Sequence, residues 1–140
     1  MIGKKRILLI GIVLLITVFT LFLFRVFKPA GNLHNVEPDF IVTSRELMND
    51  FSVNEVLANS RYVDKILLVK GEIEEIIDSN DELIILLKTD DMFSGISCRM
   101  EDPEDVKAGL LKNGQRIIIK GQCAGKLIDV VLNHCVIVDD

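Results

Sequence analysis

An uncharged apolar segment near the N-terminus constrains this chain more than any other feature of its 140 residues. Residues 7–24 (ILLIGIVLLITVFTLFLF) contain 15 apolar side chains, one glycine and two threonines. As an α-helix they rise about 27 Å, close to the roughly 30 Å thickness of the bilayer hydrocarbon core. The segment therefore predicts a membrane-spanning helix, and residues 1–28 are assigned to an N-terminal membrane anchor.

A cleaved signal peptide is the alternative for the same segment. The apolar region of a signal peptide usually has about 7–15 residues and precedes small residues at a cleavage site. Here Arg25-Val26-Phe27-Lys28-Pro29 follows the apolar run, and Ala30-Gly31 is the nearest pair of small residues. The region also has no cysteine to which a lipid could be attached. The sequence therefore favours an anchor that is not cleaved.

The basic residues beside the apolar segment predict its orientation. Lys4, Lys5 and Arg6 precede the segment, whereas Arg25 and Lys28 follow it. Because positive charge is retained on the cytoplasmic side, this small excess places the N-terminus in the cytoplasm. The remainder of the chain is then expected outside the cytoplasm, which is the periplasm in a Gram-negative host.

The rest of the chain is strongly acidic. Five of the 16 basic residues precede residue 29 and all 21 acidic residues follow residue 36, so residues 29–140 hold 11 basic and 21 acidic residues. Their length suits one small globular domain. Residues 29–42 (PAGNLHNVEPDFIV) contain two of the three prolines, which predicts a linker between the anchor and a domain at residues 43–140.

The domain shows one helical pattern followed by five strand-like segments. Thr43 and Glu46 have the spacing of a capping box, and apolar residues then recur at helical spacing, which predicts an amphipathic helix over residues 43–59. A second helical segment is expected at 104–112, between the third and fourth strands, because acidic residues begin it and lysine ends it. The predicted strands are 66–77, 82–88, 94–100, 115–124 and 127–138.

This order of elements is that of the OB-fold, a five-stranded Greek-key barrel. Gly71 and Gly121 occupy equivalent places in the predicted first and fourth strands, where such a barrel coils sharply and glycine relieves the bend. The expected fold class is therefore mainly β with α. It consists of a five-stranded OB-fold barrel preceded by an amphipathic helix, plus one N-terminal transmembrane helix.

The same residues resemble a bacterial family. The most specific matches are an Asn54-Glu55/Ala58/Tyr62 pattern at the end of the helix, and Gly121-Gln122-Cys123-Ala124-Gly125 followed by Cys135. From about residue 40 to 138 the chain resembles the tRNA_anti-like OB-fold proteins. The resemblance implies a membrane-attached or exported OB domain preceded by a helix, and it implies no assigned reaction or ligand residues. Further matching segments are Leu47, Phe51, Val69–Ile73, Cys98, Gly114-Gln115, Ile119-Lys120 and Leu132–Ile137.

Nucleic-acid binding is the first alternative function for an OB-fold. Binding of a single strand needs basic side chains along a groove and exposed aromatic rings on which bases stack. Four of the eight aromatic residues belong to the anchor or its edge, and the acidic body repels phosphate. We therefore expect nucleic acid to bind poorly. The basic residues available to line one barrel face are the candidate binding residues Lys70, Arg99, Arg116 and Lys120.

Candidate catalytic and metal-binding patterns are sparse. His34 lies in the predicted linker, and His134 precedes Cys135, whose side chain should point to the opposite face of a strand. The run 78–82 resembles the start of a calcium loop, but Leu83 stands where that loop requires glycine. We therefore expect no catalysis, no metal and no cofactor.

A periplasmic haem chaperone is the second alternative, because that family also joins one N-terminal anchor to an OB domain with a histidine near the end of the chain. His134 has a comparable place in this sequence. The chain reads Leu132-Asn133-His134-Cys135-Val136 where that family has a Leu-Ala-Lys-His-Asp-Glu motif, and the helix predicted at 43–59 has no counterpart there.

The three cysteines predict one disulfide bond. The third and fifth strands of an OB barrel run parallel and adjacent, so Cys98 and Cys135 can meet in an oxidising compartment. Cys123 and Cys135 are expected about seven residues apart along a hairpin, or about 23 Å, which is too far for a bridge. Cys123 is therefore expected to be free or buried.

Together these features predict a membrane-tethered, extracytoplasmic OB-fold module for binding or assembly. A protein or peptide partner is favoured over a deeply held small molecule, because the expected connections at residues 78–81 and 124–126 are short. In an OB barrel the loops at these two places usually widen the ligand groove, and short loops do so less.

Overall fold

The computed structural model describes residues 3–26, 33–79, 82–102 and 111–139. The chain divides into two compact units, Met1–Gly31 and Asn32–Asp140. The first unit contains helix α1 (Lys4–Val26), in which Lys5–Leu23 is long and apolar enough to cross a membrane. A signal sequence near the N-terminus shares these properties. The Thr17 hydroxyl donates to the Val13 carbonyl oxygen at 2.9 Å, so its polar group is satisfied inside the helix.

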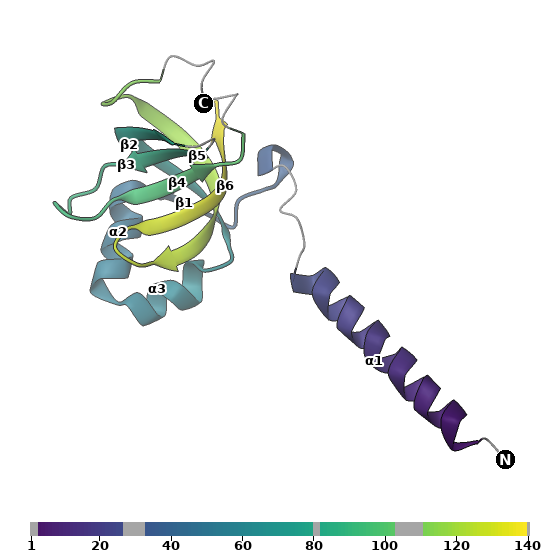
Figure 1. Cartoon of the computed structure of the whole chain (residues 1–140). Helices are drawn as coiled ribbons and strands as arrows, with labels where there is room; N and C mark the ends of the chain where they lie inside the picture. The colour runs from purple at the N-terminus through teal and green to yellow at the C-terminus, as the bar shows by residue number, and fades with distance from the viewer. Residues whose placement is uncertain (1–2, 27–32, 80–81, 103–110, 140) are drawn as a thin grey trace. The chain divides into compact units, whose positions relative to one another are not determined.

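Five strands of the second unit close into a barrel. Their order is β2-β3-β4-β6-β5, and the pairing of β5 with β2 closes the ring. Neighbouring strands are antiparallel except β4 and β6, which run parallel. This topology confirms the predicted OB-fold (Figure 1). The strands are β2 (Ile66–Ser79), β3 (Glu82–Leu87), β4 (Ile96–Met100), β5 (Arg116–Lys126) and β6 (Val130–Val138).

The barrel core is built by alternation along each strand. In β3, for example, Leu83, Ile85 and Leu87 are buried, while the residues between them are partly exposed. Helices α2 (Ser44–Val53) and α3 (Glu55–Tyr62) add Phe51 and Tyr62 to the same cluster of buried side chains. Burial of this continuous apolar surface is the main stabilising contribution to the fold.

A sixth strand corrects the predicted linker at residues 29–42. Strand β1 (Phe40–Thr43) pairs parallel with β2, with Phe40 opposite Leu67. Phe40 and Val42 pack against the barrel core, and the short helix η1 (Leu33–Asn35) buries Leu33. The described residues 33–42, which the sequence assigned to the linker, therefore include parts that pack with the folded unit. Four residues beside a proline gave too short a pattern for a strand to be recognised.

Asn54 divides the predicted helix 43–59 in two. Its backbone N–H caps the end of α2 by donating to Asp50, and its side chain accepts a hydrogen bond from the Leu57 N–H to begin α3. The capping box of Thr43 and Glu46 is confirmed, but the second helix ends at Tyr62 rather than near residue 59. The helix expected at 104–112 falls mostly on residues 103–110, outside the described residues.

The two strand glycines allow close approach between segments. A Cβ atom at Gly71 would lie 3.1 Å from both Ser44 Oγ and Leu87 Cδ1. A Cβ atom at Gly121 would lie 2.6 Å from Cys135 Sγ, closer than two such atoms can approach. Glycine is therefore required at Gly121 by the space its neighbours occupy, in addition to the coiling of the strand.

Candidate functional site

A groove of about 670 Å³ lies where α2 begins beside β2 and the start of β5. Its walls come from the β1–α2 junction, the middle of β2, Lys88 after β3, the start of β5 and the end of β6. The apolar part of the lining consists of Leu111, Ile117, Ile118, Ile137 and Val138. The volume falls within the roughly 300–1,000 Å³ of ordinary ligand sites.

One hydrogen bond fixes the helix wall against the strand wall. Ser44, at the start of α2, is buried, and its hydroxyl donates to the Lys88 carbonyl oxygen at 2.6 Å. The missing side chain at Gly71 leaves room for Ser44 at this point. Because the Ser44 hydroxyl is buried and already bonded to the backbone, its role is to hold the groove rather than to act as a nucleophile.

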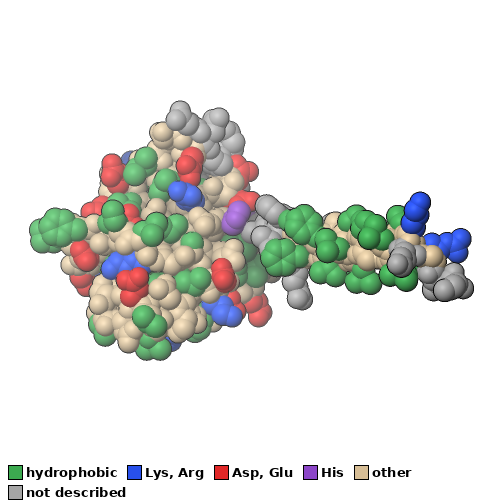
Figure 2. Space-filling model, turned by 60° about the horizontal axis from the view of Figure 1, so that its bottom comes forward, with side chains coloured by type: hydrophobic (Ala, Val, Ile, Leu, Met, Phe, Trp, Pro, Cys, Tyr) green, Lys and Arg blue, Asp and Glu red, His purple; other side chains and the backbone are tan. Residues whose placement is uncertain are grey.

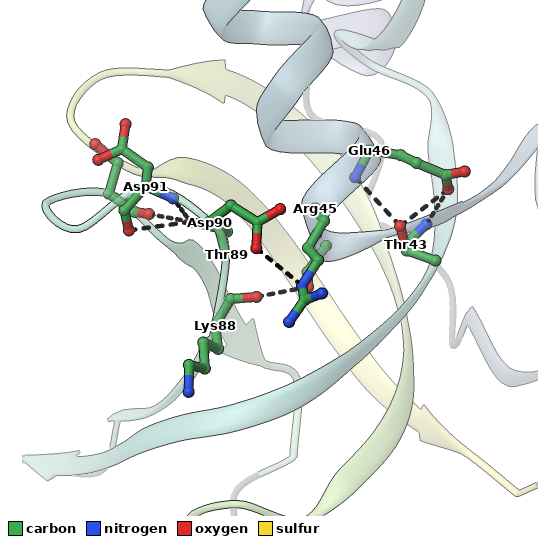
Figure 3. A network of polar contacts seen from close by, with 9 residues as sticks. Thr43, Arg45, Glu46, Lys88, Thr89, Asp90 and Asp91 are labelled. Atoms are coloured by element: carbon green, nitrogen blue, oxygen red, sulfur yellow. Dashed lines mark hydrogen bonds and ion pairs between the residues drawn. The ribbon is translucent and has the colours of Figure 1, made fainter.

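A polar network borders the groove at the same junction (Figure 3). The Thr43 N–H donates to the Glu46 carboxylate at 2.9 Å, and this backbone hydrogen bond lowers the pKa of Glu46. Arg45 Nε lies 3.2 Å from Asp90 Oδ1 and joins α2 to the loop between β3 and β4. Both members of this pair are largely exposed, so it orients the Arg45 guanidinium without adding much stability.

The groove differs in charge from the rest of the unit. Its lining includes four basic side chains, Arg45, Lys70, Lys88 and Arg116, and two acidic ones, Glu72 and Asp139. Residues 29–140 as a whole carry 11 basic and 21 acidic residues. A local basic excess in an acidic domain attracts anionic groups to this groove in preference to other parts of the surface.

The structure brings together two of the four candidate binding residues. Lys70 and Arg116 line the groove from the paired strands β2 and β5. Arg99 lies on β4, where its Nε is 3.0 Å from Glu82 Oε1, and it is not part of the groove lining. The expectation that all four residues line one binding face is therefore corrected.

Lys120 has a structural position instead. It is only 6% exposed, because η1 and the following residues cover it. Its ammonium donates to the carbonyl oxygens of Leu33 at 3.1 Å, His34 at 3.1 Å and Val36 at 2.8 Å. Lys120 therefore fastens the start of the folded unit to β5.

Sequence reasoning missed Arg45 and Lys88. Arg45 occupies the first turn of α2, and Lys88 directly follows β3. Lys88 reaches the groove through the β2–β3 pairing, in which its N–H donates to the Glu72 carbonyl oxygen at 2.9 Å, so the two predicted strands were a usable signal. Arg45 is brought there by the β1–β2 pairing, and recognition of β1 as a strand would have been the signal for it.

No aromatic side chain lines the groove among the described residues. Phe40 and Tyr62 instead stack edge to face, with ring centroids 5.3 Å apart, and Arg61 lies over both rings. Phe51 is buried in the core. The groove therefore lacks the rings on which nucleobases stack in single-strand-binding OB domains.

Within the described part of the chain, no group of three or more His, Cys, Asp or Glu residues has the geometry to hold a metal ion. His134 contacts the Glu101 carboxylate through Nδ1, and its side chain is exposed, whereas Cys135 is buried. The opposite exposure of these two neighbours agrees with the expected alternation. His134 has a left-handed φ of 53°, at a bulge where β6 has one residue more than β4.

The bulge also sets the positions of the cysteines. Cys98 pairs with Leu132 and Met100 with Cys135, so Cys98 and Cys135 lie close together across the parallel strands. Burial first, and then the hydrogen bond with Cys98, raises the pKa of the Cys135 thiol. Cys123 lies opposite Leu132, so its offset from Cys135 along the hairpin is three residues rather than the expected seven.

We predict that Cys98 and Cys135 form a disulfide when the domain matures in an oxidising compartment; the structure holds both as thiols. Peptide mapping without reduction, after thiol blocking in native membranes, should recover the two peptides linked and Cys123 alkylated only after unfolding. Burial raises the pKa of Cys123 as well, so little of it is reactive thiolate in the folded protein. Recovery of alkylated Cys98 from the native protein would refute the bridge.

Comparison with solved structures gives several matches. A candidate nucleic acid-binding lipoprotein from Klebsiella pneumoniae has 23% identity, covering 69% of this chain and 91% of that chain, with a TM-score of 0.56. An OBody bound to hen egg-white lysozyme has 11% identity, covering 57% and 87%, with a TM-score of 0.43. A candidate aspartyl-tRNA synthetase from Leishmania major has 11% identity, covering 74% and 22%, with a TM-score of 0.46.

Comparison with family models gives a match that extends over the N-terminal apolar helix as well as the barrel. No curated protein shows significant similarity to the chain. The family model described as tRNA_anti-like matches residues 1–137, a longer span than the resemblance from residue 40 to 138. With its N-terminal apolar helix, its OB barrel and this match over nearly the whole length, the chain belongs to the tRNA_anti-like family.

Proposed function

We propose that this protein is a membrane-anchored, extracytoplasmic OB-fold module that binds an acidic, extended segment of a partner protein. The observation that carries the proposal is the groove, whose lining combines apolar side chains with Arg45, Lys70, Lys88 and Arg116. Such a surface can take apolar side chains of a peptide whose carboxylates pair with the basic residues. The proposed role is binding and assembly, without catalysis.

Nucleic acid is the second candidate ligand. The basic groove favours it, and the Klebsiella protein of similar fold is described as a candidate nucleic acid-binding lipoprotein. The composition of the groove opposes it, because base stacking contributes about 1–3 kcal/mol per base and no aromatic ring lines the groove in the described part of the chain. The acidic surface around the groove also disfavours a long phosphate backbone.

The proposed location rests on α1. Lys5–Leu23 is long enough to span a bilayer, and Lys4, Lys5 and Arg6 favour a cytoplasmic N-terminus. Alkaline phosphatase fused after Asp140 should then be active in cells, and the protein should remain in the membrane fraction after alkaline washing. A soluble, shortened product would show that the segment is a cleaved signal sequence.

Binding is tested with the full chain in nanodiscs and three fluorescein-labelled probes: an octapeptide alternating Glu and Val, the matching Lys and Val peptide, and a 15-nucleotide oligo-dT. Fluorescence anisotropy should show salt-sensitive binding of the Glu peptide and weak binding of the other two. Lys70→Glu combined with Arg116→Glu should weaken the Glu peptide at least tenfold, about 1.4 kcal/mol. Empty nanodiscs are titrated in parallel.

Arg99→Glu is the matched control for Lys70→Glu or Arg116→Glu measured alone, because each single substitution changes the net charge by the same amount and Arg99 lies on β4 outside the groove. It should alter peptide affinity by less than about twofold, as expected for an exposed charge distant from the ligand. Equal losses in the groove and control variants would show that net charge rather than the groove causes binding. Tight binding of oligo-dT that is lost in the groove variant would replace the peptide proposal with the nucleic-acid one.

A further inference from the structure

Two loops at one end of the barrel expose large apolar side chains. In the loop between β3 and β4, Met92 is 89% and Phe93 is 86% exposed. In the loop between β5 and β6, Leu127 is 89% and Ile128 is 73% exposed. These side chains contribute nothing to the core of the unit. Single exposed apolar residues are ordinary, but four of them on neighbouring loops mark a contact surface.

The two loops are adjacent. Strands β4 and β6 run parallel, with Ile96 opposite Val130, so the loops that precede them emerge at the same end of the barrel. Two hydrogen bonds join the bases of the loops: the Gly95 N–H donates to Asp129 Oδ1 at 2.8 Å, and the Val130 N–H donates to the Gly95 carbonyl oxygen at 3.1 Å. In Figure 1 the β3–β4 loop projects beyond the barrel, and Figure 2 shows hydrophobic side chains at the same outer edge of the domain.

Hydrogen bonds hold the longer loop in this projecting conformation. The Thr89 hydroxyl donates to the Ser94 carbonyl oxygen at 2.5 Å and closes the loop at its base. Asp91 Oδ1 accepts from the Phe93 N–H at 2.8 Å, and Asp90 is paired with Arg45. The loop is therefore pre-organised with Met92 and Phe93 directed to solvent, which reduces the entropy that binding would cost.

The charges near the loop tips distinguish between possible occupants. Residues 89–95 and 127–129 contain three aspartates and no basic residue. Each aspartate has a partner: Asp90 pairs with Arg45, Asp91 accepts from the Phe93 N–H beside the tip, and Asp129 accepts from the Gly95 N–H at the base of the loops. The tips therefore present apolar surface without attraction for an anionic group, which suits the hydrocarbon region of a bilayer.

The length of the connecting chain keeps this surface near a membrane. Residues 27–32 separate Val26, the last residue of α1, from Leu33, which Lys120 binds to β5. An extended chain over this distance spans at most about 25 Å. Lys126, at the end of β5, lies six residues beyond Lys120, about 20 Å at strand rise. A connecting chain of this length therefore keeps the folded unit within reach of a bilayer surface.

We propose that Met92, Phe93, Leu127 and Ile128 insert into the surface of the bilayer in which α1 is anchored. This second attachment rests on the anchoring part of the proposed function. It holds the barrel against the membrane in one orientation. Insertion of aromatic and aliphatic side chains to the acyl-chain boundary is the general mode by which peripheral segments bind membranes.

The absence of tryptophan from the sequence allows a direct test. Three single-tryptophan variants of the full chain are reconstituted into phosphatidylcholine vesicles that contain doxyl-labelled phosphatidylcholine. Ile12→Trp reports insertion of α1, and Phe93→Trp reports insertion of the loop tip. Ile41→Trp, at an exposed position of β1, is the matched control for a side chain that is close to the bilayer without entering it. Tryptophan at 93 should be quenched at least about twofold more strongly than tryptophan at 41, with emission shifted to shorter wavelength.

The outcomes separate the two proposals. Strong quenching at residue 12 with equal, weak quenching at residues 41 and 93 would overturn loop insertion and leave the anchor intact. No quenching at residue 12 would overturn the anchor, and with it the proposal for the loops. Protection of tryptophan 93 from aqueous acrylamide without lipid quenching would assign the loops to a second copy of the chain and contradict insertion. Quenching that requires added phosphatidylglycerol would also contradict it, because the loops carry only acidic charge.

Discussion

Replacing Gly121 with alanine is expected to lower the free energy of unfolding of the barrel by about 2–3 kcal/mol. The new methyl carbon would lie 2.6 Å from Cys135 Sγ, 3.2 Å from Leu132 Cβ and 3.3 Å from the Asn133 carbonyl oxygen. Leu132 Cβ and the Asn133 carbonyl oxygen are fixed by the backbone of β6, so neither can move unless β6 shifts. Urea-dependent pulse proteolysis of the full chain in detergent, under reducing conditions, would measure the loss.

Cys135→Ala provides the control for this prediction. Alone it should destabilise the barrel by about 1 kcal/mol, because it leaves a small cavity. Combined with Gly121→Ala it should recover much of the lost stability, since the two changes exchange space within one contact and are therefore not additive. Simple addition of the two losses would show that the need for glycine at this position has another cause.

Lys120→Met is expected to have an effect of similar size, about 2–3 kcal/mol, because three carbonyl oxygens lose a charged donor. Methionine retains most of the buried aliphatic stem, so the change tests the ammonium rather than packing. Amide hydrogen exchange should accelerate mainly in residues 33–43, the segment that precedes α2. Leu33, His34 and Val36 lie more than 80 residues before Lys120 in the sequence. Faster exchange confined to their segment would therefore show that the lost hydrogen bonds are the cause.

The exposed Lys65→Met is the matched control for Lys120, and it should leave both the stability and the exchange of residues 33–43 nearly unchanged. Uniform acceleration of exchange over the whole barrel in Lys120→Met would contradict a local fastening role. Unchanged exchange in residues 33–36 would show that the Lys120 hydrogen bonds contribute little to holding this segment.

The barrel could be recognised from the sequence because its strands are long and rich in apolar residues. Strands β2 and β5, for example, contain the apolar, β-branched-rich runs Ile66–Val69 and Ile117–Ile119, which are typical of buried strands. Strand β1 is only four residues long and follows Pro38, so local patterning indicates a linker. Its pairing with β2 depends on tertiary packing of Phe40 and Val42.

The candidate site was predictable only in part, for a related reason. Lys70, Arg116 and Lys120 share the outer face of the paired strands β2 and β5, and strand alternation identifies that much. Whether a residue on this face meets solvent or backbone depends on what covers it. For Lys120 the cover is a segment about 85 residues earlier in the chain. The offset between Cys123 and Cys135 similarly depends on where the β5–β6 hairpin turns, with Lys126 opposite Val130, and alternation alone does not reveal this.

The fastening of residues 33–36 by Lys120 has a mechanical consequence. If a partner held in the groove is pulled while α1 stays in place, tension enters the barrel through residue 33 before it reaches any other part of the folded unit. The Lys120 hydrogen bonds are then loaded first, and the four-residue pairing of β1 with β2 is loaded next. The barrel strands are thus shielded from the first displacement, because this short segment would detach from β5 and β2 before the barrel itself is loaded.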